Sequence, residues 1–107
     1  MKFENLLTSQ LAGVEGTEVV VSVVTVPPNT TLPKHYHPGE EFAYLMEGSV
    51  TLIQEGHPDV VCKKGDAVVV PLKQVHTIRT DNASCSMVVF RVHEQGEPER
   101  ILLDEAV

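Results

Sequence analysis

The chain has 107 residues, with eight basic and fifteen acidic side chains and a formal net charge of −7 when histidine is neutral. This length favours one domain over residues 1–107 that buries a core unaided. The acidic balance argues against nucleic-acid binding, because neutralisation of phosphates supplies most of that affinity. No apolar run approaches the roughly 20 residues of a membrane-spanning helix. The N-terminal stretch lacks the apolar core of a signal peptide, so we expect a cytoplasmic protein without a membrane partner.

Short strands separated by turn residues are predicted along most of the chain. The stretch 3–11 is compatible with either a short strand or a turn. After it, residues rich in β-branched and other apolar side chains predict strands at 18–26, 42–46, 50–54, 60–62, 67–70, 74–79 and 85–93. No segment of useful length has the periodicity of a helix. These features predict an all-β sandwich or barrel, and residues 101–103 are candidates for docking on its body.

Residues 33–48, PKHYHPGEEFAYLMEG, hold a dense group of ligand-type side chains. His35 and His37 are separated by one residue, so in an extended strand both imidazoles leave the same face, with Cα atoms roughly 6.6 Å apart. That spacing allows both rings to approach one metal ion. Glu41 follows a Pro-Gly break that can turn its carboxylate towards the same point. The stretch therefore predicts a metal site on a sheet.

This stretch also resembles the first motif of the cupin superfamily. The motif consists of a glycine, five residues, His-x-His, three or four residues, a glutamate, six residues and a glycine. The spacing from His35 through Glu41 to Gly48 follows it. Asn29 stands at the position of the leading glycine, and asparagine tolerates the left-handed conformation that this position would require.

A second cupin motif is recognisable downstream, and the two motifs together span residues 29–80. Gly65, Pro71 and His76 match it in register. Lys73 replaces its glycine and Thr80 replaces its asparagine, which are departures in the turn near Pro71 rather than at the candidate ligand His76.

The resemblance implies a single-domain cupin β-barrel, also described as a double-stranded β-helix with a jelly-roll-like arrangement. It also implies that one metal ion is bound inside the barrel by four side chains, namely His35, His37, Glu41 and His76. Three neutral imidazoles and one carboxylate suit a divalent transition metal, and Fe, Mn, Ni, Zn and Cu all remain open. Such an ion can lower the pKa of bound water or polarise a carbonyl or enolate oxygen.

The alternation of side chains after Gly39 assigns them to two faces. If Glu41 points inward, Ala43 and Leu45 line the pocket and favour a compact, partly apolar ligand. Glu40 is a candidate general base, against a solvent-facing position on the opposite side of the strand. The outer face would carry an apolar stripe that favours burial against the terminal segments or a second subunit. We expect a homodimer formed through this stripe, which consists of Phe42, Tyr44 and Met46.

Two functions remain open from the sequence. The first is a small metal-dependent enzyme acting on a small organic acid or enol, and the resemblance implies dioxygenase-, decarboxylase- or isomerase-like activity. The second is a non-catalytic cupin module that binds or senses a small ligand or the metal itself. Cys62 and Cys85 are expected to be ordinary core or surface thiols, and His57 and His93 are not expected to bind metal.

Overall fold

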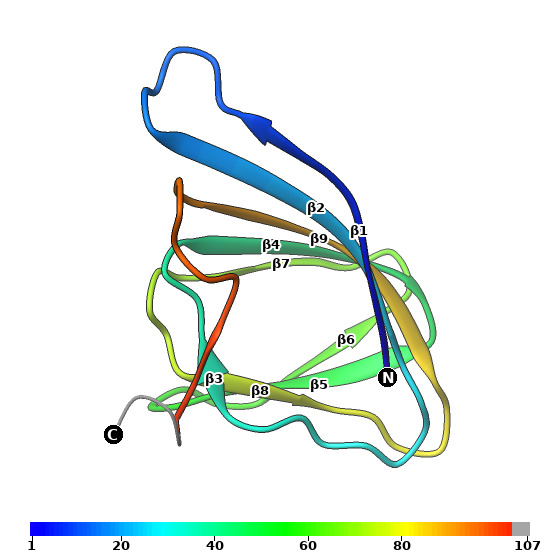
Figure 1. The fold of residues 1–107 in the computed structure, drawn as a ribbon. Helices are drawn as coiled ribbons and strands as arrows, with labels where there is room; N and C mark the ends of the chain where they lie inside the picture. The colour runs from blue at the N-terminus through cyan, green and yellow to red at the C-terminus, as the bar shows by residue number, and fades with distance from the viewer. Residues whose placement is uncertain (104–107) are drawn as a thin grey trace.

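The computed structural model describes residues 1–103, which form ten strands in two facing antiparallel sheets (Figure 1). The first sheet has the order β1 (Lys2–Gln10), β2 (Thr17–Val26), β9 (Cys85–Glu94), β4 (Glu40–Glu47) and β7 (Ala67–Val70). The second has the order β10 (Ile101–Leu102), β3 (His35–Tyr36), β8 (His76–Arg79), β5 (Ser49–Gln54) and β6 (Val60–Lys63). Within residues 1–103, no helix is long and apolar enough to cross a membrane.

The all-β prediction is confirmed, and every predicted strand overlaps an observed one. The ambiguous N-terminal stretch is a strand, β1, whose pairing with β2 is irregular between Asn5 and Leu7. That irregularity breaks the alternation on which a prediction from sequence would depend. The tail segment docks on the body of the barrel through β10, in which Ile101 pairs with Tyr36 and Leu102 pairs with His35.

The space between the sheets is filled by the inward side chains of long alternating strands. In β2, the inward positions from Val20 to Val26 are buried at every second residue, and β9 shows the same alternation from Cys85. These strands contribute most of a core cluster that also includes Leu45, Val50 and Cys62. Burial of each Val or Leu side chain stabilises the fold by about 1.5–3 kcal/mol.

The alternation of β9 continues beyond the apolar core into polar residues. Arg91 and His93 follow Val89 on the inward side, and both are buried. On the neighbouring strand β4, Glu41 is buried and lies opposite Arg91 in the pairing register. The interior therefore has an apolar part and a polar part, and the candidate site lies in the polar part.

Two non-glycine residues adopt positive φ at the positions where the cupin motifs have glycine. Asn29 has φ 54° and Lys73 has φ 60°. The backbone N–H of Lys73 donates to the carbonyl of His37 at 3.1 Å. The turn after Pro71 thus keeps its conformation without glycine, and it anchors the backbone at a candidate ligand.

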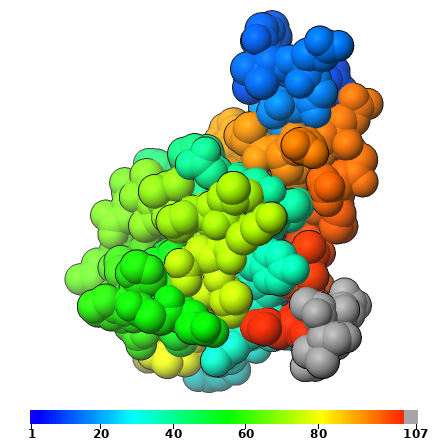
Figure 2. Space-filling view, turned by 90° about the vertical axis from the view of Figure 1, so that its left-hand side faces the viewer, coloured from blue at the N-terminus to red at the C-terminus, as the bar shows by residue number. Residues whose placement is uncertain are grey.

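The turn end of the hairpin made of β1 and β2 projects from the barrel (Figures 1 and 2). All nine residues of β1 are exposed, including Phe3, Leu6 and Leu7. β1 is an edge strand, since it pairs with β2 on one side.

Candidate metal centre

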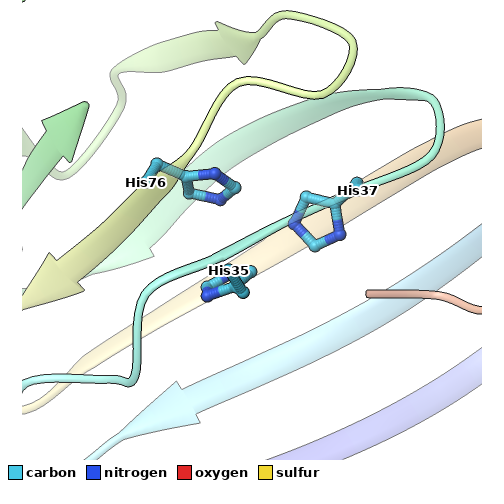
Figure 3. Close-up of side chains that lie close together, drawn as sticks. All are labelled: His35, His37 and His76. Atoms are coloured by element: carbon cyan, nitrogen blue, oxygen red, sulfur yellow. The ribbon is translucent and has the colours of Figure 1, made fainter. Parts of the chain in front are cut away.

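Three histidines meet in the polar part of the interior (Figure 3). His35 and His37 come from β3 and the residue that follows it, and His76 begins β8. Because β3 pairs with β8, His35 lies directly opposite His76. One nitrogen from each ring lies within 4.8 Å of the others, and all three residues are buried. The structure therefore brings together two histidines that are separated by one residue in the sequence and a third some forty residues away.

The orientation of each ring is fixed by a backbone carbonyl. His35 Nδ1 lies 2.8 Å from the carbonyl oxygen of Pro33, and His76 Nδ1 lies 2.9 Å from that of Gln74. His37 Nδ1 lies 2.7 Å from the carbonyl oxygen of Glu99 in the tail. A carbonyl only accepts, so each Nδ1 carries the proton and each Nε2 is left with a lone pair. Carbonyl acceptors of this kind hold metal-binding histidines in the correct tautomer.

Glu41 completes the group from β4. Its Oε2 lies 3.0 Å from His37 Nε2, and its Oε1 lies 3.7 Å from His76 Nε2. Burial would raise the pKa of this carboxyl, but its contacts with His37 and His76 and the charge of Arg91 outweigh burial. The pKa of Glu41 is thus held well below its usual range, and the side chain is anionic.

The contact between His37 and Glu41 tests whether a metal ion fits the site. Among the described residues, the buried His37 Nε2 has no hydrogen-bond partner. In the neutral ring its lone pair faces a carboxylate oxygen at 3.0 Å, so two acceptors oppose each other. Either a second proton on the ring or a cation bound by both atoms satisfies this pair. The donor set therefore fits a divalent transition metal.

His35 is in the form that binds metals. Burial lowers the pKa of its imidazole from 6.5 to about 4, outweighing its hydrogen bond to Pro33. The ring is therefore neutral at pH 7, and its unprotonated Nε2 does not need to lose a proton before it binds an ion.

Arg91 is a site residue that the sequence reasoning missed. Its Nε donates to Glu41 Oε2 at 3.0 Å, and the ring of Phe3 lies 4.8 Å from its Cζ. The signal was present in the alternation of residues 85–93, since a strand with Val89 inward also has Arg91 inward. The cupin motifs do not include this position, so the resemblance gave no reason to examine it.

The cluster borders two neighbouring cavities in the interior. One is lined by Glu41, Ala43 and Leu45 together with core side chains. The other is lined by His35, Glu41, His76 and Arg91. Glu40 is exposed and lies on a separate groove on the outside, next to Val92 and His93. A catalytic role for Glu40 at the cluster gains no support from this position.

The remaining histidines and cysteines lie outside the cluster. His57 is exposed in a turn. His93 is buried, and its Nε2 lies 2.9 Å from Glu18 Oε1. Cys62 and Cys85 are buried and form no disulfide within the described chain. Burial raises the pKa of both thiols, which makes them unreactive core residues.

The sequence also matches a known protein family. A family described as the cupin domain matches residues 22–93. The chain belongs to the cupin family. The matched segment includes all three clustered histidines, Glu41 and Arg91. The facing sheets agree with this assignment, so the predicted cupin β-barrel is confirmed.

The cupin is also similar to a curated protein of known activity. It is 34% identical over 70 residues to dimethylsulfoniopropionate lyase DddQ from Ruegeria pomeroyi. The aligned residues are 64% of this chain and 35% of the lyase. The crystal structure of the same lyase superposes with a TM-score of 0.74 at 27% identity, covering 83% of this chain and 45% of the lyase. The chain thus spans less than half the length of this relative.

More distant structures show the same fold. The polyketide cyclase RemF from Streptomyces resistomycificus superposes with a TM-score of 0.68 at 23% identity, covering 85% of this chain and 73% of that one. A cupin-like protein from Thermotoga maritima has a TM-score of 0.66 at 22% identity, with 96% and 79% of the two chains covered.

Proposed function

We propose that this cupin is a mononuclear metal enzyme, or the metal-binding domain of one, that acts on a small organic acid or enol. The observation that carries the proposal is the convergence of three buried imidazoles, each held with Nε2 free, beside an anionic Glu41. The residues that would hold the ion are His35, His37, Glu41 and His76. When bound, a divalent ion would act as a Lewis acid towards an oxygen of the substrate.

The protein's own groups prepare this site in three ways. The carbonyls of Pro33, Gln74 and Glu99 fix the rings, so no reorientation is needed when a ligand binds. Arg91 donates to Glu41 Oε2 at 3.0 Å and so restricts the rotation of this carboxylate. The walls of the cavity beside Glu41 are mostly apolar, and low polarity strengthens the electrostatic interactions of the charged groups next to it.

The similarity to a lyase decides which reaction is tested first. The relative named above is a lyase, so we place lyase chemistry ahead of the dioxygenase-, decarboxylase- and isomerase-like alternatives. The test is metal analysis of the purified protein, followed by turnover assays on dimethylsulfoniopropionate and a panel of keto acids and enediols. Each assay is run after loading with Fe(II), Mn, Ni or Zn. Turnover that depends on one of these metals supports the proposal, and its absence with every metal contradicts it.

A non-catalytic binding module is the second candidate, and one feature of the site favours it. In the cavity beside His35, the described lining residues include no carboxylate or histidine beyond the proposed ligands. A dedicated general acid or base is therefore missing from that lining. Tight binding of a small ligand without turnover under any metal would favour this module.

We further propose that the cupin forms a homodimer through the outer face of its first sheet. Phe42 lies between Val69 and Phe90 in the pairing register, and these three side chains are 41–48% exposed. They line a shallow outer groove together with Tyr44. Met46 does not extend this stripe as expected, because it is half-buried next to an irregularity between Leu45 and Glu47. Light scattering that gives a monomer mass at micromolar concentration would contradict the dimer.

A further inference from the structure

One nitrogen of the Arg91 guanidinium is buried without a hydrogen-bond partner among the described residues. Arg91 is 4% exposed, and its Nε donates to Glu41 Oε2. Its Nη1 is buried and finds no partner among residues 1–103. Buried polar groups are almost always hydrogen-bonded, and an unpaired donor on a charged group is a costly exception. Such a donor marks a position where a bound acceptor would be stabilised.

Phe3 restricts the directions from which that acceptor can come. Its ring lies 4.8 Å from the Cζ of Arg91, so the guanidinium is held against an aromatic ring. Arg91 lines the cavity that also contains His35 and His76. Met1 and Phe3 form a wall of this cavity and are about half exposed (51% and 40%). A small ligand can therefore enter beside these two residues and reach the guanidinium.

The charges around the cavity favour an anion. Glu41 and Arg91 compensate each other through their direct contact. Arg100 is a second arginine that lines the same cavity, and no described carboxylate other than Glu41 lines it. The lining therefore carries one net positive charge when the histidines are neutral. Arg100 also offsets the repulsion between a bound anion and Glu41.

The rest of the lining is aliphatic. Val24, Leu32, Ile78, Met87 and Val89 form the walls away from the arginines. A cavity with charged donors at one end and aliphatic walls at the other matches a ligand with an anionic head and a short hydrocarbon body. Planar carboxylates suit the donors of a guanidinium particularly well.

We propose that Arg91 selects a short-chain aliphatic carboxylate as the ligand of this cavity, with its hydrocarbon body against the aliphatic wall. This inference rests on the proposed function, because it names the substrate class of the same site. A ligand held by Arg91 lies beside His35 and His76, so its reacting carbon atoms are close to the proposed metal. A neutral enol would leave Nη1 without an anionic acceptor, so we expect it to bind more weakly than a carboxylate.

The test compares propionate with propionamide, which have the same size and hydrocarbon body but differ in charge. Calorimetric titrations are run on the metal-free protein and on the zinc-loaded protein. Hydrogen bonds to charged groups predict that propionate binds about tenfold or more tighter than propionamide in both states. Equal binding of the two probes, or binding of neither, would overturn the proposal.

Variants assign the preference to Arg91. In Arg91→Gln the preference for propionate is expected to fall to about twofold or less, because the charged donor is gone. Arg91→Lys keeps a charged partner for Glu41 but offers one ammonium for two acceptors, so the preference for propionate is expected to fall. This variant provides the test if Arg91→Gln does not fold. Arg79→Gln is the matched control, since Arg79 is exposed on β8 and lines neither interior cavity. A preference that survives both Arg91 variants would refute the assignment.

Metal content measured on the same samples separates this inference from the proposed function. A retained preference for propionate in a protein that binds no metal would contradict the metal enzyme and support the role of Arg91. One bound ion per chain without any preference for propionate would contradict the role of Arg91 alone.

Discussion

The buried pair of Glu41 and Arg91 gives the sharpest prediction for stability. Glu41→Gln removes the charge that compensates Arg91, whose side chain is 5% exposed. Removal of one partner from a buried ion pair costs about 3–5 kcal/mol. The glutamine amide oxygen can still accept from Arg91 Nε, and the amide NH2 then takes the position of Oε1, 3.7 Å from His76 Nε2. We therefore expect a loss near the lower limit, about 3 kcal/mol.

Urea denaturation in the presence of a chelator measures this loss without a contribution from bound metal. With an m-value of about 2 kcal/mol/M, the midpoint is expected to fall by about 1.5 M. Glu40→Gln is the matched control, because the neighbouring Glu40 is exposed and a surface change shifts stability by no more than about 0.5 kcal/mol. If the two variants unfold at the same urea concentration, the compensating role of Glu41 is wrong.

Three further predictions concern the site. His37→Ala should lower metal occupancy at least about tenfold, while His57→Ala, an exposed histidine, should leave it unchanged; equal stoichiometry in the two variants would contradict the ligand set. Gly39→Ala would place a Cβ 1.8 Å from the carbonyl oxygen of Val92. It should destabilise the fold by about 3 kcal/mol or more, against about 1 kcal/mol for Gly56→Ala, where only the positive φ is unfavourable; similar losses in urea denaturation would argue against close packing at Gly39. The third concerns pH. Because the pKa of His35 falls from 6.5 to about 4 on folding, the unfolded chain takes up the proton first. The stability of the metal-free protein should be retained above pH 6.5 and should fall by up to about 3 kcal/mol as the pH drops towards 4. His35→Gln should reduce this fall, and an unchanged pH profile in that variant would contradict the assignment.

The strands and the histidine cluster could be predicted because their signals are local or belong to a spaced motif. β-Branched runs such as residues 18–26 alternate cleanly and form strands. Strand geometry alone suggested that His35 and His37 share a face, whereas His76 could be joined to them only through the resemblance to cupins. The pairing of His35 with His76 is the contact that realises this expectation.

Other features depend on contacts that no local pattern encodes. The carbonyl of Glu99 that orients His37 lies 62 positions away, in a tail segment with few strand-forming residues. The partnership of Arg91 with Glu41 requires β9 and β4 to be neighbours in register. Alternation could have placed Arg91 inside, but only the sheet order shows which carboxylate it meets. Similarly, Lys73 has φ 60° and its backbone N–H donates to the carbonyl of His37, a contact that its own side chain does not reveal.

The central claim is that the three clustered histidines and Glu41 bind one divalent transition metal. The most direct test is equilibrium dialysis of the chelator-treated protein against Mn, Fe(II), Ni and Zn, with metal per chain determined by elemental analysis. The same measurement is made on His76→Gln, which removes the ligand contributed by β8. The account predicts one ion per wild-type chain with at least one of these metals and a loss of affinity of about tenfold or more in the variant. Binding of none of the metals, or equal affinity in the variant, would contradict it.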